Sequence, residues 1–169
     1  QTTARLPWLL IGMIGGIGNS MILGNFDSTF AAHPEMALYI PLIGGTGGNV
    51  GTQSSALVVQ GLANSSLDAK NTFKQVSKEA VVALINATII SLLVYTYNFI
   101  RFGATATVTY SVSISLFSVV MFASIFGTLV PMTLEKMKID PAIATGPFIA
   151  ITNDIIGMMM YMGITVLLS

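Results

Sequence analysis

The sequence predicts an all-α polytopic membrane protein, a single transmembrane domain with five transmembrane helices per subunit, and three observations support this fold class. Of the 169 residues, 53% are hydrophobic and only 8% are charged, whereas about a quarter of the residues of a typical soluble domain are charged. The apolar residues form runs of about 20 residues or more, the length that a helix needs to span a bilayer. Polar segments divide the chain into five such runs, so we expect five spans.

The first predicted span covers about residues 6–26. Arg5 precedes it, and Trp8 lies at its start, where an indole suits the membrane interface. Gly12 and Gly16 form a small-xxx-small pair, which is typical of a helix that packs closely against another helix. We therefore expect a close helix contact at these two glycines.

A short polar loop, residues 27–35, leads to the second predicted span, about residues 36–63. The centre of this span, residues 41–55, is rich in glycine and carries amides and hydroxyls at a depth where polar groups that face lipid are costly. Such a helix can approach a neighbour closely and offer carbonyl, hydroxyl and amide oxygens to a hydrated guest. Helical spacing places Gly45, Gly48 and Thr52 on one face, with Asn49 and Gln53 stacked beside it.

Residues 64–79 form a polar connector to the third predicted span, about residues 80–100. Three lysines recur every four residues in the connector, which predicts a short helix at the membrane surface whose basic face is solvated and fixes the orientation. The fourth predicted span, about residues 107–134, is rich in serine, whose hydroxyl can bond back to its own helix or across to a neighbour. The lysines are Lys70, Lys74 and Lys78, and the serines are Ser111, Ser113, Ser115 and Ser118.

The fifth predicted span covers about residues 141–168, with Asp140 as its N-cap and Pro141 at its first helical position. Asp154 is the only charged residue after Asp140, and it lies near the middle of this span. An ionised carboxylate near the bilayer centre costs at least ~2.5–3.5 kcal/mol on insertion scales, so it normally faces a partner, a cavity or an ion path.

Small residues surround this carboxylate on the predicted helix. Ala150 and Gly157 share a side with Asp154 at helical spacing. Gly146 and Pro147, about two turns earlier, can loosen the helix and free a carbonyl, because proline has no amide hydrogen. These features favour a cation site at Asp154. The alternative is a protonated Asp154 that is hydrogen-bonded inside a helical bundle.

The distribution of basic residues predicts how the chain is oriented. Because successive spans reverse direction, the start of the chain and the connectors after the second and fourth spans share one side, which holds six basic residues against Arg101 alone on the other. The positive-inside rule makes that side cytoplasmic, which places the N terminus in the cytoplasm and the C terminus outside the cell membrane. The start at Gln1 without a signal-peptide pattern predicts a transmembrane domain cut from a longer protein. The six are Arg5, Lys70, Lys74, Lys78, Lys136 and Lys138.

Several function classes are excluded by composition and motifs. The chain has no cysteine, which rules out disulfides and thiolate metal sites. Its net charge is zero and it has no basic block, so we expect no nucleic-acid partner. The glycine-rich segment lacks the lysine of a phosphate-binding loop, and the chain has neither a pair of buried carboxylates nor H-E-x-x-H, so we do not expect an enzyme.

The oxygen-rich spans suit a hard cation. Mg²⁺ dehydrates reluctantly, so one carboxylate with hydroxyl and carbonyl oxygens around it suits a Mg²⁺ that keeps most of its waters. One carboxylate is a weak match for a divalent charge, whereas two copies around a symmetry axis supply two. We therefore expect a homodimer with a pore on its axis.

Three motifs resemble the transmembrane domain of the MgtE family of Mg²⁺ channels, and together they cover nearly the whole chain in order. They are R-L-P-W from Arg5, P-L-I-G-G-T-G-G-N-V-G-T-Q-S-S-A-L-V-V-Q-G-L-A from Pro41, and D-P-A-I-A-T-G-P-F-I-A-I-T-N-D-I-I-G from Asp140. The resemblance implies a homodimer of five-helix subunits with the ion path between the second and fifth spans at the subunit interface. It implies that Asp154 is the pore aspartate and that the pore is lined by Gly45, Gly48, Asn49, Thr52, Ala150 and Gly157.

Full-length members of this family carry cytoplasmic regulatory domains, including a CBS pair, that sense Mg²⁺ and close the pore. This sequence does not encode them, so the resemblance does not determine how this chain is gated. The leading hypothesis is a channel that conducts hydrated Mg²⁺ into the cytoplasm. Exchange of Mg²⁺ for Na⁺ or H⁺, with Asp154 as a proton relay, is a second hypothesis, and a non-conducting membrane scaffold is a third from a different class. The sequence does not decide whether other divalent cations also pass.

Overall fold

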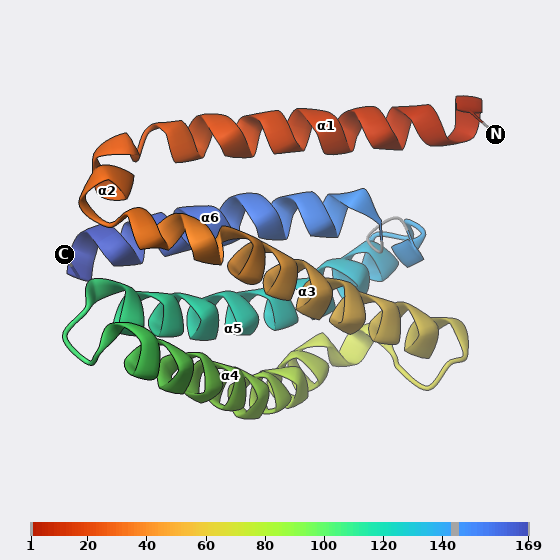
Figure 1. Cartoon of the computed structure of the whole chain (residues 1–169). Coiled ribbons are helices and arrows are strands. Elements are labelled where there is room, and N and C mark those ends of the chain that lie inside the picture. The colour runs from red at the N-terminus through yellow and green to blue at the C-terminus, as the bar shows by residue number, and fades with distance from the viewer. Residues whose placement is uncertain (1, 143–145, 169) are drawn as a thin grey trace.

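The structure, a computed structural model, describes residues 2–142 and 146–168, with the side chains of all but Ala69 and Pro147. Within these ranges the chain is helical apart from its connectors (Figure 1). The long helices are α1 (Thr2–Gly24), α3 (Ile40–Ala63), α4 (Thr72–Phe102), α5 (Thr107–Lys136) and α6 (Pro147–Leu168). The short elements are α2 (Asp27–Ala32) and the 3₁₀ helices η1 (Pro34–Tyr39) and η2 (Ala69–Asn71).

Helix α5 forms the centre of the bundle, where it packs against α3, α4 and α6. Helix α1 lies along the edge of the bundle and makes its main helix contact with α6 (Figure 1). None of the residues of α1 is buried. The two chain ends lie at opposite ends of the bundle in Figure 1, as expected when an odd number of long helices alternates in direction.

Four of the described helices are long and apolar enough to cross a membrane, namely α1, α4, α5 and α6 from Phe148 onward. The chain is therefore a multi-pass membrane protein. Helix α3 is long enough as well, with 24 residues. Its glycines and polar residues lower its hydropathy, so its role as a fifth span stays a prediction.

The helix that contains the third predicted span begins about two helical turns before that span. The polar connector was expected to contain a separate surface helix, but α4 begins at Thr72 and runs without a break to Phe102. Lys74 and Lys78 therefore lie on the first turns of α4 itself. Only Lys70 remains in the connector, in the short helix η2.

The predicted start of the fifth span is also wrong, because the long helix α6 begins at Pro147 and not at Pro141. The side chain of Asp140 does accept a hydrogen bond from the backbone N–H of Ala142, at 3.0 Å, so it caps a short turn as an N-cap would. Pro147 opens the long helix because a proline at the first helical position lacks a donor that would be unsatisfied there anyway.

The glycine pair expected to mediate packing in α1 does not do so among the described residues. A Cβ atom at Gly12 or Gly16 would meet nothing within 4 Å. The close contact is made one helical position away, where a Cβ at Gly15 would collide with the side chain of Ile151 on α6. The first span thus packs through a glycine, as predicted, but through a different one.

The apolar core lies toward the end of the bundle where η1, the start of α3, the start of α5 and the end of α6 meet. Hydrogen bonds between helices also gather there. The hydroxyl of Tyr161 donates to the backbone oxygen of Met36 at 2.8 Å, and the hydroxyls of Ser111 and Thr165 lie 2.6 Å apart. The core residues are Met36, Tyr39, Ile43, Val108, Val112, Leu116, Val119, Met158, Tyr161 and Met162.

The serines of α5 behave in both ways that the sequence predicts. Ser113 donates to the carbonyl oxygen of Thr109 and Ser118 to that of Ile114, each at 2.9 Å, so these two bond back to their own helix. Ser111 instead reaches across to α6.

Candidate cation site

One face of α3 packs directly against α5 because its glycines carry no side chain. A Cβ at Gly47 would lie 2.7 Å from Cγ1 of Val119, closer than real Cβ atoms come to a neighbour. Further along, a Cβ at Gly127 of α5 would lie 2.6 Å from the carbonyl oxygen of Gly51 and 3.2 Å from its Cα. The two helix backbones touch at this point, which only glycine on both helices allows.

Helix α6 joins the same contact through Asn153. A Cβ at Gly51 would collide with the amide nitrogen of Asn153 and would lie 3.1 Å from Cγ2 of Ile149. Asn153 is 1% exposed, and neither its amide nitrogen nor its amide oxygen has a hydrogen-bond partner among the described residues. Three helices therefore meet at one point, and the side chain inserted there is polar.

The opposite face of α3 is open. A Cβ at Gly45 or Gly48 would meet nothing within 4 Å. Asn49 and Thr52 are exposed on the same side of the helix. The four residues that the sequence assigns to a pore lining on α3 thus share one surface, and no other described part of the chain covers it.

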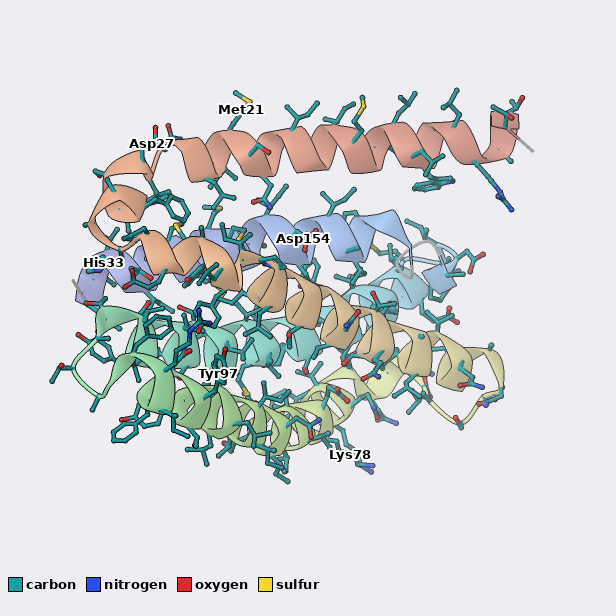
Figure 2. All side chains as sticks on the ribbon, in the orientation of Figure 1. Met21, Asp27, His33, Lys78, Tyr97 and Asp154 are labelled. Carbon is teal, nitrogen blue, oxygen red and sulfur yellow. The ribbon has the colours of Figure 1, made fainter. Side chains whose placement is uncertain are left out.

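Asp154 lies on α6 beside this open surface. Figure 2 shows it near the middle of the helix. Its Oδ1 atom would lie 3.3 Å from a Cβ at Gly44, so the carboxylate rests against the α3 backbone where a side chain is missing. Asp154 is half-buried, and no hydrogen bond or ion pair of its carboxylate is found among the described residues. The carboxylate therefore keeps its oxygens available for a guest.

The other two predicted lining residues of α6 occupy different surroundings. Ala150 is half-exposed, one turn before Asp154. Gly157 is buried, and a Cβ there would lie 3.7 Å from both methyl groups of Val119 on α5. Gly157 thus faces α5 and does not lie on the surface formed by Gly45 and Gly48.

The charge available at the site is one carboxylate per chain. The part of the chain that the structure describes contains no group of three or more histidine, cysteine, aspartate or glutamate side chains that could hold a metal ion. A dehydrated metal with several protein ligands therefore does not suit this site. A carboxylate beside glycines and exposed hydroxyl and amide groups suits an ion that keeps its water shell.

Sequence reasoning missed two residues at this site. Gly44 makes room for the carboxylate, and Asn153 fills the junction of three helices directly before Asp154 in sequence. The signal for Gly44 was present, because it is seven residues before Gly51 and three before Gly47, the spacing of one helix face. The sequence contains two such glycine faces, and only the structure shows which one packs inward.

A side-chain hydrogen bond also connects α3 to α4. The hydroxyl of Ser54, which is 4% exposed, donates to Oε1 of Glu79 at 2.8 Å. This bond connects the carboxylate of Glu79 on α4 to α3.

Residues 40–164 match the family model of MgtE, which is described as a divalent cation transporter. The chain is 32% identical over 160 residues to a magnesium transporter MgtE of Bacillus subtilis, a match that covers 95% of this chain and 35% of that protein. It is 32% identical over 165 residues to a magnesium transporter MgtE of Thermus thermophilus, with 98% of this chain and 36% of that protein covered. A magnesium transporter MgtE of Enterococcus faecalis is 29% identical over 163 residues. The chain spans about a third of the length of these curated relatives.

Proposed function

Because the chain belongs to the MgtE family of divalent cation transporters, we propose that it forms a homodimeric channel that conducts hydrated Mg²⁺ into the cytoplasm. Membership of a transporter family agrees with the prediction that the chain is not an enzyme. The observation that carries the proposal is the carboxylate of Asp154, half-buried in a membrane helix, without a partner, and resting against Gly44. A charge in that position costs free energy unless a cation offsets it.

The chemistry of the site favours Mg²⁺ with its inner waters in place. Mg²⁺ demands octahedral geometry at about 2.0–2.1 Å and gives up water reluctantly. Asp154 is the one acidic group at the site, and its neighbours on α3 are glycines with open space in front of them. Water molecules of the ion can donate hydrogen bonds to the carboxylate and to backbone and hydroxyl oxygens. The site then selects by the size of the hydrated ion, and we expect long, water-mediated contacts and not direct coordination.

The open surface of α3 is the place for a second subunit. One carboxylate balances half of a divalent charge, and a twofold axis beside Asp154 would supply the other half. The exposed Asn49 and Thr52 would then line the path together with the bare backbone at Gly45 and Gly48. In this arrangement the packed face of α3 holds the subunit together, and the open face holds the ion.

The direction of transport follows from the membrane potential. Moving a divalent charge inward gains roughly 4.6 kcal/mol per 100 mV, twice the value of a unit charge. With the basic connector ends in the cytoplasm, this gradient alone supports uptake without a second ion. The cytoplasmic placement of the N terminus and the outside placement of the C terminus are part of the proposal.

Flux through the purified chain in liposomes tests the proposal. Vesicles loaded with a Mg²⁺-sensitive dye would be clamped at a set potential with valinomycin, with Na⁺ absent and the pH equal on both sides. Channel conduction predicts Mg²⁺ entry that increases with the inside-negative potential. Entry that needs a Na⁺ or pH gradient would indicate exchange instead, and vesicles that stay tight to Mg²⁺ under every condition would indicate a scaffold.

A further inference from the structure

A small polar cavity lies where the connector after α3 meets the first turns of α4. Its volume is about 120 Å³. Lys74 and Lys78, one helical turn apart, supply its positive charge, and Asp68 supplies the only carboxylate among its lining residues. The remaining lining residues are Ser66, Leu67, Asn71 and Gln75. The cavity therefore combines two ammonium groups with side-chain amide donors, a set that suits an anion.

The position of the two lysines along α4 places them at the level of lipid headgroups. The uncharged run of α4 from Ala80 to Ile100 is about 30 Å long at a rise of 1.5 Å per residue, which matches the hydrocarbon core of a bilayer. Lys78 then lies at the edge of the core, and Lys74 lies about 6 Å further out, among the headgroups. Figure 2 shows Lys78 projecting away from the bundle.

Exposed apolar residues flank the two lysines on both sides along α4. Phe73 is 87% exposed directly beside Lys74. An aromatic ring at this level is typical of a membrane interface. Below the lysines, the start of the uncharged run exposes Val81, Val82, Leu84 and Ile85.

The acidic groups nearby offset only part of the charge of the two lysines. Glu79 follows Lys78 in sequence, but it accepts the hydrogen bond from Ser54 on α3. Oδ1 of Asp68 accepts a hydrogen bond from the backbone N–H of Lys70 at 3.0 Å. These bonds hold both carboxylates in place without removing their charge. Asp68 therefore offsets one of the two lysines, and the lining of the cavity keeps an excess of one positive charge.

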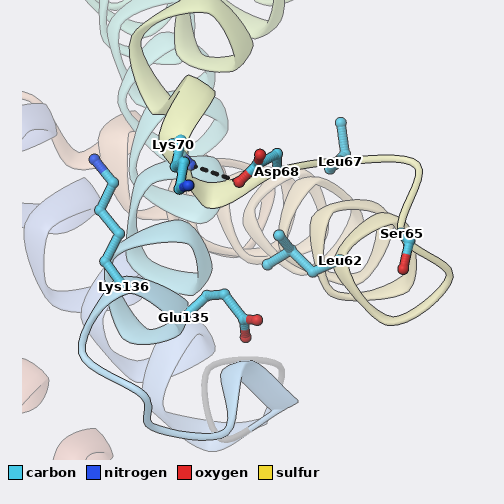
Figure 3. Close-up of a pocket in the computed structure, with 7 residues that line it drawn as sticks. All are labelled: Leu62, Ser65, Leu67, Asp68, Lys70, Glu135 and Lys136. Carbon is cyan, nitrogen blue, oxygen red and sulfur yellow. Dashed lines mark hydrogen bonds between the residues drawn. The ribbon is translucent and has the colours of Figure 1, made fainter.

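A neighbouring cavity provides a built-in comparison. It is larger, about 540 Å³, and lies between the same connector and the end of α5 (Figure 3). Two lysines, Lys70 and Lys136, line it together with two carboxylates, Asp68 and Glu135, so its charges balance. The two cavities share a side of the membrane and differ in charge, and only the smaller one has an excess of positive groups.

We propose that Lys74 and Lys78 bind the phosphate of an anionic phospholipid whose acyl chains lie along the exposed face of α4. The two ammonium groups hold the phosphate oxygens, and the side-chain amides of Asn71 and Gln75 add neutral donors. A lipid fits better than a free anion because the exposed apolar residues at the start of the uncharged run of α4 can contact its tails.

Binding of phosphatidylglycerol to the purified chain in a zwitterionic detergent tests this proposal. Native mass spectrometry would count retained lipid for the parent chain, for Lys74→Gln/Lys78→Gln and for the control Lys70→Gln/Lys136→Gln, which removes the same charge from the balanced cavity. Each lysine near an anionic surface contributes roughly a factor of five to affinity. We therefore expect a loss of roughly 25-fold in the first variant and less than about fivefold in the control.

An arginine variant and two further ligands distinguish the possible outcomes. Lys74→Arg/Lys78→Arg keeps both charges and should retain the lipid, which separates charge from any effect on folding. Phosphatidylcholine should bind to no variant preferentially, and inorganic phosphate at millimolar concentration should not displace the lipid. Equal losses in both glutamine variants would overturn the site in favour of diffuse attraction. Displacement by inorganic phosphate would overturn the lipid as its ligand.

Discussion

The two faces of α3 carry the same residue type and do opposite things. Gly47 and Gly51 lie against α5 and α6 so closely that no Cβ fits, whereas Gly45 and Gly48 face open space. Gly47 and Gly48 are neighbours in sequence, and each residue turns a helix by about 100°. The comparison teaches that a missing side chain brings helices together on one face and leaves room on the other. Substitutions on the two faces should therefore separate stability from transport.

The largest effect is expected at Asp154, on the open side. Asp154→Asn should lower Mg²⁺ flux roughly tenfold or more, because a hydrogen bond to a charged group is worth about 1.5–3 kcal/mol and each 1.4 kcal/mol is a factor of ten. The fold should hold or become more stable, since the amide removes an unpaired charge from the membrane. Flux and thermal stability would be measured on the same purified variant. A destabilised protein whose surviving fraction conducts normally would refute the site.

A bulky side chain on the open face should come next. Gly48→Leu fills space that is empty within the chain, so the subunit should fold while flux falls severalfold or the proposed dimer separates. Liposome flux and the molecular mass in detergent would distinguish the two outcomes. Unchanged flux together with an unchanged mass would show that this glycine contributes only backbone flexibility.

On the packed face, the effect should be on stability. Gly127→Ala places a methyl group against the backbone of Gly51, which has no side chain that could move aside. We expect a loss of about 1–3 kcal/mol in the free energy of unfolding, the usual range for overpacking. Gly48→Ala is the matched control on the open face, where alanine should stabilise the helix by up to about 1 kcal/mol. Thermal melting of both proteins in the same detergent gives the comparison, and equal melting temperatures would mean that the two faces do not differ.

The smallest effect is expected at the tie between α3 and α4. Ser54→Ala removes the hydrogen bond to Glu79 and should cost about 0.5–1.5 kcal/mol, the net value of a typical hydrogen bond, because water can reach the half-buried carboxylate. Glu79→Gln keeps a hydrogen-bond acceptor at this position and should lose less. Mg²⁺ flux per folded molecule should stay the same in both. A loss of flux without a loss of stability would connect this bond to the ion path.

The sequence predicted much of the fold because membrane spans obey a simple length rule. The five apolar runs became five long helices, and the start of α5 at Thr107 was predicted correctly. The start of α6 was not, because Asp140–Pro141 and Gly146–Pro147 both carry the signals of a helix start, and pattern alone does not rank them. The sequence prediction assigned Lys74 and Lys78 to a connector because charged residues usually lie outside a span. In the structure they belong to α4, since a helix can extend beyond the bilayer.

The candidate site could be predicted only in part for a geometric reason. A single carboxylate in an apolar run identified Asp154 without any structure. The two glycine faces of α3 are offset by one residue along the helix, and helical periodicity fits both equally well. The pattern alone therefore did not show that Gly44 lies on the packed face. Gly157 was placed by its spacing from Asp154, but helix α5 covers it through Val119. Which faces are covered depends on neighbouring helices, and that information is not local in sequence.

The contact between α1 and α6 has a mechanical consequence. Helix α1 buries none of its own residues and packs mainly on α6, with Gly15 against Ile151. Ile151 lies one turn before Asp154 on the same helix. A displacement of α1 therefore acts on α6 by direct contact, in addition to the path along the chain through α2 and η1. A tilt of α1 would shift the part of α6 just before the carboxylate.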